Sequence, residues 1–146
     1  MYYLKKSFYY LHIDLFCTIN SINMYSYWRS SKLFIGEVSK ITNLPIKTLR
    51  FYEEKGLISP DYRNDSNKRV YSEENIRWIT FVKHLRGTGM ALKEIKEFKF
   101  LVEKGETTKY KRLEMLEKQR LLTIKQLEQK KEELDHIIYK IGMLRD

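Results

Sequence analysis

The sequence contains almost no cysteine. Its single cysteine, Cys17, excludes a disulfide framework within the chain and any cysteine-rich zinc or iron–sulfur site. The three histidines, His12, His84 and His136, are far apart and lack the spacing of metal ligands. We therefore predict no metal and no other cofactor, and we interpret Cys17 as a reduced thiol.

Long hydrophobic runs are also missing. The most apolar stretch, YYLHIDLFCTINSI at 9–22, contains His12 and Asp14 and is shorter than the roughly 20 apolar residues that a membrane-spanning helix needs. It has no convincing small-residue cleavage site, so a secretory signal is not expected. These absences predict a cytoplasmic protein that does not enter a membrane.

Catalytic patterns are the third absence. The chain shows no nucleophile beside a base, no cluster of metal-binding side chains and no glycine-rich loop that could hold a phosphate. We therefore predict that the protein is not an enzyme.

Positive charge, by contrast, is abundant. The 146 residues include 28 Lys and Arg but only 19 Asp and Glu, which gives a formal net charge of +9. A small basic chain favours polyanionic partners, with nucleic acid the first candidate and an anionic membrane surface the second. Charge alone does not decide between them. The length suits one compact domain with an appendage.

Residues 1–32 differ from the rest of the chain. They hold six of the eleven tyrosines, among Ile, Asn and Ser, without a helical or strand period. Three interpretations are open: a disordered extension, a short adhesive arm, or upstream codons translated from a misplaced start. Met24 precedes a well-patterned region by a few residues, which favours the last interpretation.

Residues 33–104 form the patterned domain. A first amphipathic helix is predicted over 35–44, because Ile35, Val38 and Ile41 recur at steps of three. Pro45 interrupts it and suits the first turn of a second helix. This second helix, IKTLRFYEEK, places Ile46, Leu49 and either Phe51 or Tyr52 inward, and Gly56 suits its C-terminal end. Two short helices joined by a tight turn predict a helix-turn-helix.

A β-hairpin, or wing, is expected next. Leu57-Ile58 and Arg69-Val70-Tyr71 suit short strands, and RNDSNK between them is rich in turn-forming residues. Ser72 is a suitable cap for a third helix, EENIRWITFVKHLR, and a fourth helix is predicted in ALKEIKEFKFLVEKG.

Residues 105–146 predict one long helix with a heptad seam. The apolar positions of this seam, in which Arg120, Thr123 and Lys130 also fall, are Leu113, Leu116, Leu127, Leu134, Ile137 and Ile141. A long helix gains little from an apolar stripe that faces water, so we expect a partner. We favour self-association over folding back onto the same chain.

Residues 35–97 resemble the DNA-binding domain of MerR-family transcription regulators. The resemblance is carried by IGEVSKITNLPIKTLRFYEEKGLI, RNDSNKRVYSEENI and LRGTGMALKEIKE. It implies a mainly α fold in which a winged helix-turn-helix DNA-binding domain is followed by a long dimerisation helix. That helix resembles the family's antiparallel coiled coil, and the chain resembles the short members, which have no separate effector domain.

Candidate DNA contacts lie on the second helix and the hairpin, where basic side chains can neutralise phosphates and hydroxyl groups can bind phosphate oxygens. We predict contacts by Lys47, Thr48, Arg50, Tyr52, Arg63, Lys68, Arg69 and Tyr71. Phe51 lacks a hydroxyl group and is predicted to lie in the core, whereas Tyr71 is ambiguous because a strand tyrosine often exposes only its hydroxyl.

The resemblance also implies a mechanism. Such regulators bind promoter DNA as homodimers and untwist it. The two promoter elements that RNA polymerase contacts are thereby aligned, so the effect on the polymerase is indirect. Two other hypotheses remain: a DNA-architectural or plasmid-maintenance protein, and a coiled-coil adaptor for another protein.

The signal is not identified. Residues 105–146 contain no cysteine, and the third helix has His84 in FVKHLR where some short members have a sensing cysteine. His84 is either a replacement for that group or, as we favour, an exposed structural histidine. Ala91 stands where the family usually has a Ser or Thr helix cap.

Overall fold

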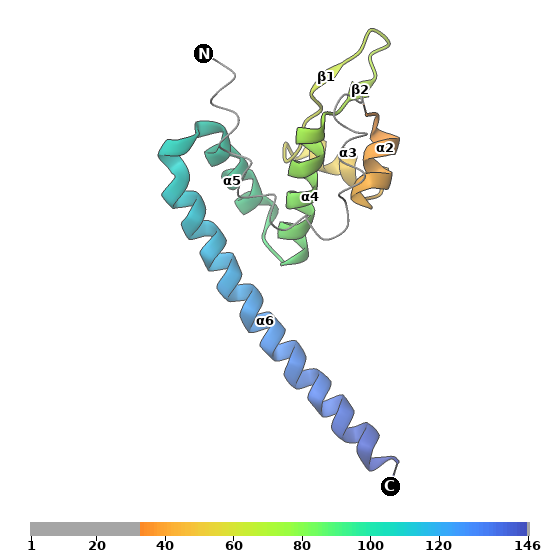
Figure 1. Ribbon diagram of the computed structural model, residues 1–146, viewed down its shortest axis with the longest axis vertical. Coiled ribbons are helices and arrows are strands. Elements are labelled where there is room, and N and C mark those ends of the chain that lie inside the picture. The colour runs from red at the N-terminus through yellow and green to blue at the C-terminus, as the bar shows by residue number, and fades with distance from the viewer. Residues whose placement is uncertain (1–32, 146) are drawn as a thin grey trace.

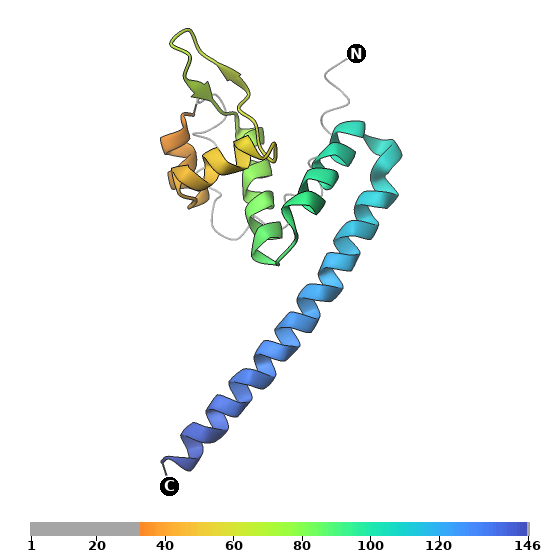
Figure 2. The same cartoon turned by 180° about the vertical axis from the view of Figure 1, so that it is seen from behind.

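The computed structural model of the protein describes residues 33–145. Short helices and a hairpin form a compact head, and one long helix leaves the head and extends away from it (Figures 1 and 2). The interpretations of residues 1–32, including Cys17 and Met24, lie outside the described residues.

The helix-turn-helix begins the head. Its helices are α2 (Ile35–Thr42) and α3 (Ile46–Glu54). The first is two residues shorter than expected, because Asn43 takes a left-handed conformation with φ 51° and ends it. Pro45 is the capping residue directly before α3, one position earlier than the predicted first turn, and Gly56 follows the end of α3 with φ +72°, as the sequence predicted. A positive φ favours glycine, which has no Cβ to clash with the backbone.

The wing is an antiparallel hairpin of β1 (Tyr62–Arg63) and β2 (Arg69–Val70). Tyr62 is paired with Val70, and Arg63 with Arg69. A further bridge joins the next residue, Tyr71, to Leu33, through backbone hydrogen bonds of 2.8 and 3.2 Å. The base of the wing is thereby attached to the start of the described chain.

The prediction of a strand at Leu57-Ile58 is wrong. The backbone N–H groups of both residues donate to the carbonyl of Tyr52, at 2.9 and 3.4 Å, and so complete the end of α3. Their side chains are 1% and 2% exposed and belong to the core. Their apolar character correctly predicts that they are buried. Their N–H groups could pair with a sheet or with the free carbonyl groups at the helix end, and here they bind the helix end.

The third predicted helix is α4 (Glu73–Gly87). Ser72 caps it as expected: its hydroxyl accepts from the backbone N–H of Asn75 at 3.4 Å. The Asn75 side chain accepts in return from the backbone N–H of Ser72 at 2.9 Å. This reciprocal pair satisfies two donors that the first turn would otherwise leave free.

The fourth predicted helix is α5 (Leu92–Lys104), which buries Ile95, Phe98 and Leu101. Its cap is half made. Glu94 accepts from the backbone N–H of Ala91 at 3.1 Å, but the Ala91 side chain can accept nothing in return.

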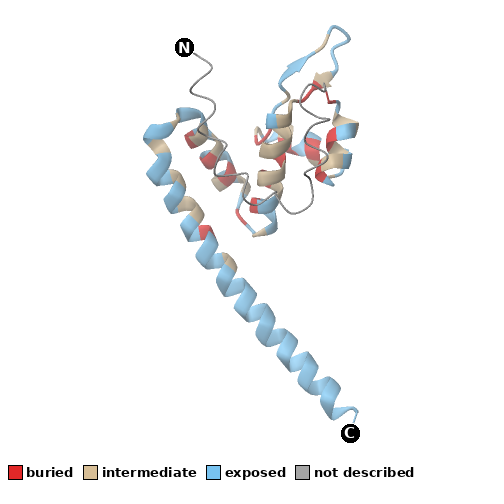
Figure 3. Ribbon diagram, viewed as in Figure 1, coloured by how far each residue is buried: buried red, intermediate tan, exposed pale blue. Residues whose placement is uncertain are grey.

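The long helix is α6 (Lys109–Met143), and a short 3-10 turn (Glu106–Thr108) precedes it. Its first part lies against the head, where the Gln119 amide donates to the carbonyl of Thr88 at 2.8 Å. Gln119 is the one residue of α6 that is buried, and the helix beyond it is almost entirely exposed (Figure 3).

The core lies where α2, α3, α4 and the first turns of α5 meet the base of the wing. Its fully enclosed side chains are Leu33, Val38, Leu49, Leu57, Tyr71, Ile79, Val82 and Ile95. The predicted fold class, a mainly α protein with a winged helix-turn-helix and a long C-terminal helix, is confirmed.

Candidate nucleic-acid interface

The outward face of α3 carries basic and aromatic side chains. An α-helix turns about 100° per residue, so Leu49 and Tyr52 share one face, and Lys47, Arg50 and Phe51 gather on the other. Leu49 and Tyr52 are 0% and 7% exposed, whereas Phe51 is 39% exposed. Within residues 33–145, the charged groups of Lys47 and Arg50 have no hydrogen-bond or ion-pair partner. They are therefore available to an anion.

The turn of the wing is held by its own side chains. The Asn64 carboxamide oxygen accepts from the backbone N–H groups of Ser66 and Lys68, at 3.1 and 2.9 Å. Asn67 is left-handed with φ 56°, and Arg63 donates to its carbonyl at 3.0 Å. The hairpin therefore has a fixed shape and presents Lys68 at its surface.

A partly buried carboxylate joins α3 to the wing. Glu53, in the last turn of α3, accepts a hydrogen bond from the hydroxyl of Tyr71 and forms an ion pair with Arg69 Nε at 2.7 Å. Burial raises the pKa of Tyr71 well above its ordinary value, and the hydrogen bond to Glu53 and its negative charge raise it further. The phenol therefore remains a donor throughout the physiological pH range.

Six of the eight predicted contact residues keep exposed surface, namely Lys47, Thr48, Arg50, Arg63, Lys68 and Arg69. The rings of Tyr52 and Tyr71 are buried instead, and the hydroxyl of Tyr71 is bonded to Glu53. The prediction that Phe51 lies in the core is wrong, because a side chain two positions from Leu49 points to the opposite side of the helix. Contact of these residues with DNA stays a prediction.

Two relevant residues were not found from the sequence. Phe51 could have been placed outside by applying the helical period strictly from Leu49. Glu53 gave no local signal, because its partner Tyr71 is 18 residues away and only the fold brings them together.

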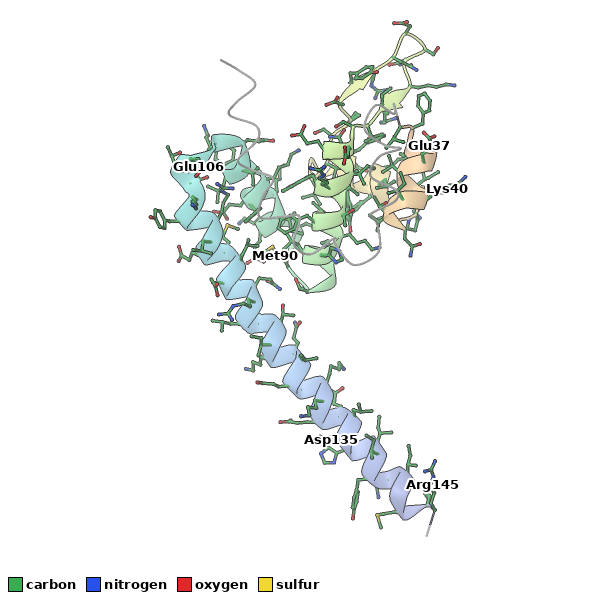
Figure 4. The ribbon with its side chains drawn as sticks, in the orientation of Figure 1. Glu37, Lys40, Met90, Glu106, Asp135 and Arg145 are labelled. Carbon is green, nitrogen blue, oxygen red and sulfur yellow. The ribbon has the colours of Figure 1, made fainter. Side chains whose placement is uncertain are left out.

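The seam of α6 is largely exposed in the single chain. Leu113, Leu127, Leu134, Ile137 and Ile141 are between 44% and 70% exposed. Leu116 is the exception, since it packs against the core of the head. Figure 4 shows Asp135 on α6 and Arg145 just beyond its end, in a region that no other element of the described chain approaches.

A shallow apolar groove of about 300 Å³ lies between the end of α4 and α6. It is lined by His84, Leu85, Thr88, Leu116, Gln119, Arg120, Thr123, Ile124 and Leu127. Leu116 and Leu127 belong to the seam, so the groove and the seam form one continuous apolar surface. His84 is exposed in this groove.

Neither a metal site nor a membrane segment is found in the described part of the chain. No three His, Cys, Asp or Glu side chains gather closely enough to hold a metal ion among residues 33–145. None of the helices described there is long and apolar enough to cross a bilayer.

Comparison with known proteins agrees with this geometry. Residues 34–99 match the family described as MerR HTH family regulatory protein. A Listeria monocytogenes protein assigned to this family is 35% identical, with a TM-score of 0.69, and the match covers 75% of this chain and 83% of that one. The chain belongs to the MerR family.

Two further relatives are informative. HiNmlR, a MerR family regulator lacking the sensor domain, was solved bound to promoter DNA; it is 28% identical, with a TM-score of 0.70, over 77% of this chain and 89% of that one. The transcriptional regulator AdhR of Bacillus subtilis is 41% identical over 90 residues, which are 60% of this chain and 64% of AdhR. The chain therefore spans less than two thirds of this curated relative.

Proposed function

We propose that this MerR-family chain is a sequence-specific, DNA-binding transcription regulator of the cytoplasm. The observation that carries the proposal is the basic outer face of α3 beside a preformed wing. Lys47 and Arg50 project from the helix with no partner in the described chain, and Lys68 projects from the hairpin. A helix of this kind fits the major groove, and a wing can follow the neighbouring backbone. The promoter DNA bound by the similar regulator HiNmlR supports the same function.

We further propose that the protein acts as a homodimer through α6. The seam leucines and isoleucines are half or more exposed in most cases, and beyond the head the helix has no neighbour among residues 33–145. A row of large apolar side chains in water favours association. A second α6, lying antiparallel against the seam, would also cover the adjoining groove beside α4.

An antiparallel dimer gives the two heads a fixed spacing. The 35 residues of α6 span about 50 Å at 1.5 Å per residue. Two such helices side by side hold the heads some tens of ångströms apart, which is the order of one turn of DNA at about 34 Å. A rigid spacing of this kind can impose a twist or bend on DNA, which costs several kcal/mol and must be offset by protein contacts.

Footprinting on the DNA around the protein's own gene tests the proposal. We expect a two-fold symmetric protected site inside a promoter, with bases at its centre more reactive to single-strand probes once RNA polymerase is present. Protection without sequence preference would favour the architectural hypothesis instead. Absence of binding at moderate salt would favour the adaptor hypothesis.

The proposed regulator changes transcription in response to a signal. Transcription from the footprinted promoter would be measured in vitro with and without candidate signals, using the purified dimer and RNA polymerase. A change in transcript without a change in DNA occupancy is the expected mark of a regulator that distorts bound DNA.

A further inference from the structure

Glu53 occupies an unusual position for a carboxylate. It lies in the last turn of the helix that presents Lys47 and Arg50, yet its side chain is only 10% exposed. One carboxylate oxygen accepts a hydrogen bond from the hydroxyl of Tyr71, and the other lies 2.7 Å from Nε of Arg69. Both partners come from the base of the wing. Removing a carboxylate from water is costly unless such partners are present.

Each partner of Glu53 is itself fixed. The ring of Tyr71 is 1% exposed, and its backbone is paired with Leu33 in both directions. Arg69 stands in β2, directly paired with Arg63 across the hairpin. The carboxylate therefore connects α3, the proposed recognition helix, to a rigid part of the wing, and not to a mobile surface side chain.

The basic side chains of the wing differ in whether they already have a partner within the described chain. Arg69 is committed to Glu53, and Arg63 donates to the carbonyl of Asn67 in the turn. The ammonium group of Lys68 has no partner among the described residues. The three neighbouring basic residues thus differ in what they can offer to a phosphate.

We propose that Glu53 is a positioning residue that fixes the wing relative to the recognition helix, and that Arg69 serves this contact and does not neutralise a DNA phosphate. The proposal rests on the proposed DNA-binding function. It assigns the phosphate contact of the wing to Lys68, the exposed residue directly before β2. The three residues Glu53, Arg69 and Tyr71 are called the clamp below.

The salt dependence of DNA binding separates the two roles of a basic residue. Each phosphate contact contributes about 0.9 to the slope of log K against log salt. Lys68→Ala should therefore lower the slope by roughly one per protomer, with a loss of affinity at low salt. Arg69→Ala should weaken binding to a similar degree but leave the slope unchanged. A slope that falls equally in both variants would overturn the assignment of Arg69.

Whether Glu53→Ala weakens or tightens DNA binding is a second, independent test. If Glu53 positions the wing, its removal weakens specific binding by about tenfold, within the range of coupled contacts. If Arg69 is a DNA contact that Glu53 merely restrains, removal frees a cation, deletes a nearby negative charge and tightens binding. Tighter binding by Glu53→Ala would therefore refute the clamp.

A double-mutant cycle completes the experiment, with fluorescence anisotropy on the footprinted site. The Glu53→Ala/Arg69→Ala variant should bind no more weakly than either single variant, because both changes open the same contact. Losses that add would contradict a shared role. Circular dichroism at the assay temperature checks that each variant is folded; should Glu53→Ala unfold, the Lys68 and Arg69 slopes still decide. If the wild-type chain itself fails to bind, the proposed function has failed, and not the clamp alone.

Discussion

Replacing Leu127 by aspartate should dissociate the proposed dimer, whereas the same change at Leu121 should not. Both leucines lie on α6 and are similarly exposed in the single chain, 70% for Leu127 and 60% for Leu121. Leu127 belongs to the heptad seam and lines the apolar groove beside α4. Leu121 follows the seam residue Arg120 by one position, about 100° around the helix, and does not line the groove. The two variants therefore introduce the same chemical change at similarly exposed sites, and they differ only in whether the site lies in the seam.

The expected size of the effect follows from the exposed area. Complete burial of a leucine side chain is worth about 1.5 to 3 kcal/mol, so covering the 70% that is exposed contributes about 1 to 2 kcal/mol. Two-fold symmetry doubles this to about 2 to 4 kcal/mol for the dimer. The dissociation constant should then rise by about 30-fold to several hundred-fold, at 1.4 kcal/mol per factor of ten. Desolvation of the new carboxylate increases the effect.

Sedimentation equilibrium across a range of concentrations measures this directly. The loss of helix propensity from leucine to aspartate, about 0.5 kcal/mol, is common to both variants and cancels in the comparison. Leu134→Asp, at a seam position that is 53% exposed, should behave like Leu127→Asp. If Leu127→Asp and Leu121→Asp have the same dissociation constant, α6 does not associate through this seam.

Four further predictions concern the head. Arg50→Ala should weaken DNA binding and lower its salt slope by about one per lost phosphate contact, with unchanged helicity; unaltered affinity would remove Arg50 from the interface. Ala91→Ser should complete the half-made cap of α5 and raise stability by about 1 kcal/mol in thermal unfolding, while Ser72→Ala at the intact cap of α4 should lower it by a similar amount. Gly56→Ala should cost about 1 to 2 kcal/mol in denaturant unfolding, because φ +72° is strained for alanine; a neutral effect would contradict this conformation. Tyr52→Ala should cost about 3 kcal/mol and Phe51→Ala less than 1, and the reverse order would restore Phe51 to the core.

The elements with strong local signals could be predicted from the sequence. Helix ends are the clearest case, because the required residue and the backbone group it serves are only a few positions apart. Examples are Pro45 before α3, Gly56 after it and Ser72 at the start of α4. For the same reason, the missing cap at Ala91 was visible in advance. Such signals depend on helix ends and turns, where the side chain and the backbone that it serves are adjacent in the chain.

The wing shows where local signals fail. Leu57 and Ile58 have strand-like composition, but the carbonyl of Tyr52 binds their N–H groups and the core takes their side chains. Strand propensity reflects how well a side chain fits a half-buried sheet. The same apolar residue types also suit a buried helix end, so the sequence does not distinguish the two environments. The two-residue strands that do form are set by the turn around Asn64, whose side chain fixes the register.

The run Arg50-Phe51-Tyr52 shows how a strict geometric rule outweighs hydrophobicity. Phe51 is the more apolar of the two aromatics, but once Leu49 is inside, a residue 200° further around the helix must be outside. Tyr52, at 300°, returns to the buried side. The consequence reaches the proposed interface, because Phe51 lies on the same outer face as Lys47 and Arg50, with the Lys55 ammonium group 5.5 Å from its ring centre. Burial in the head does not account for this exposed aromatic side chain, and on the helix face that we propose to meet DNA it can pack against thymine methyl groups once DNA is bound.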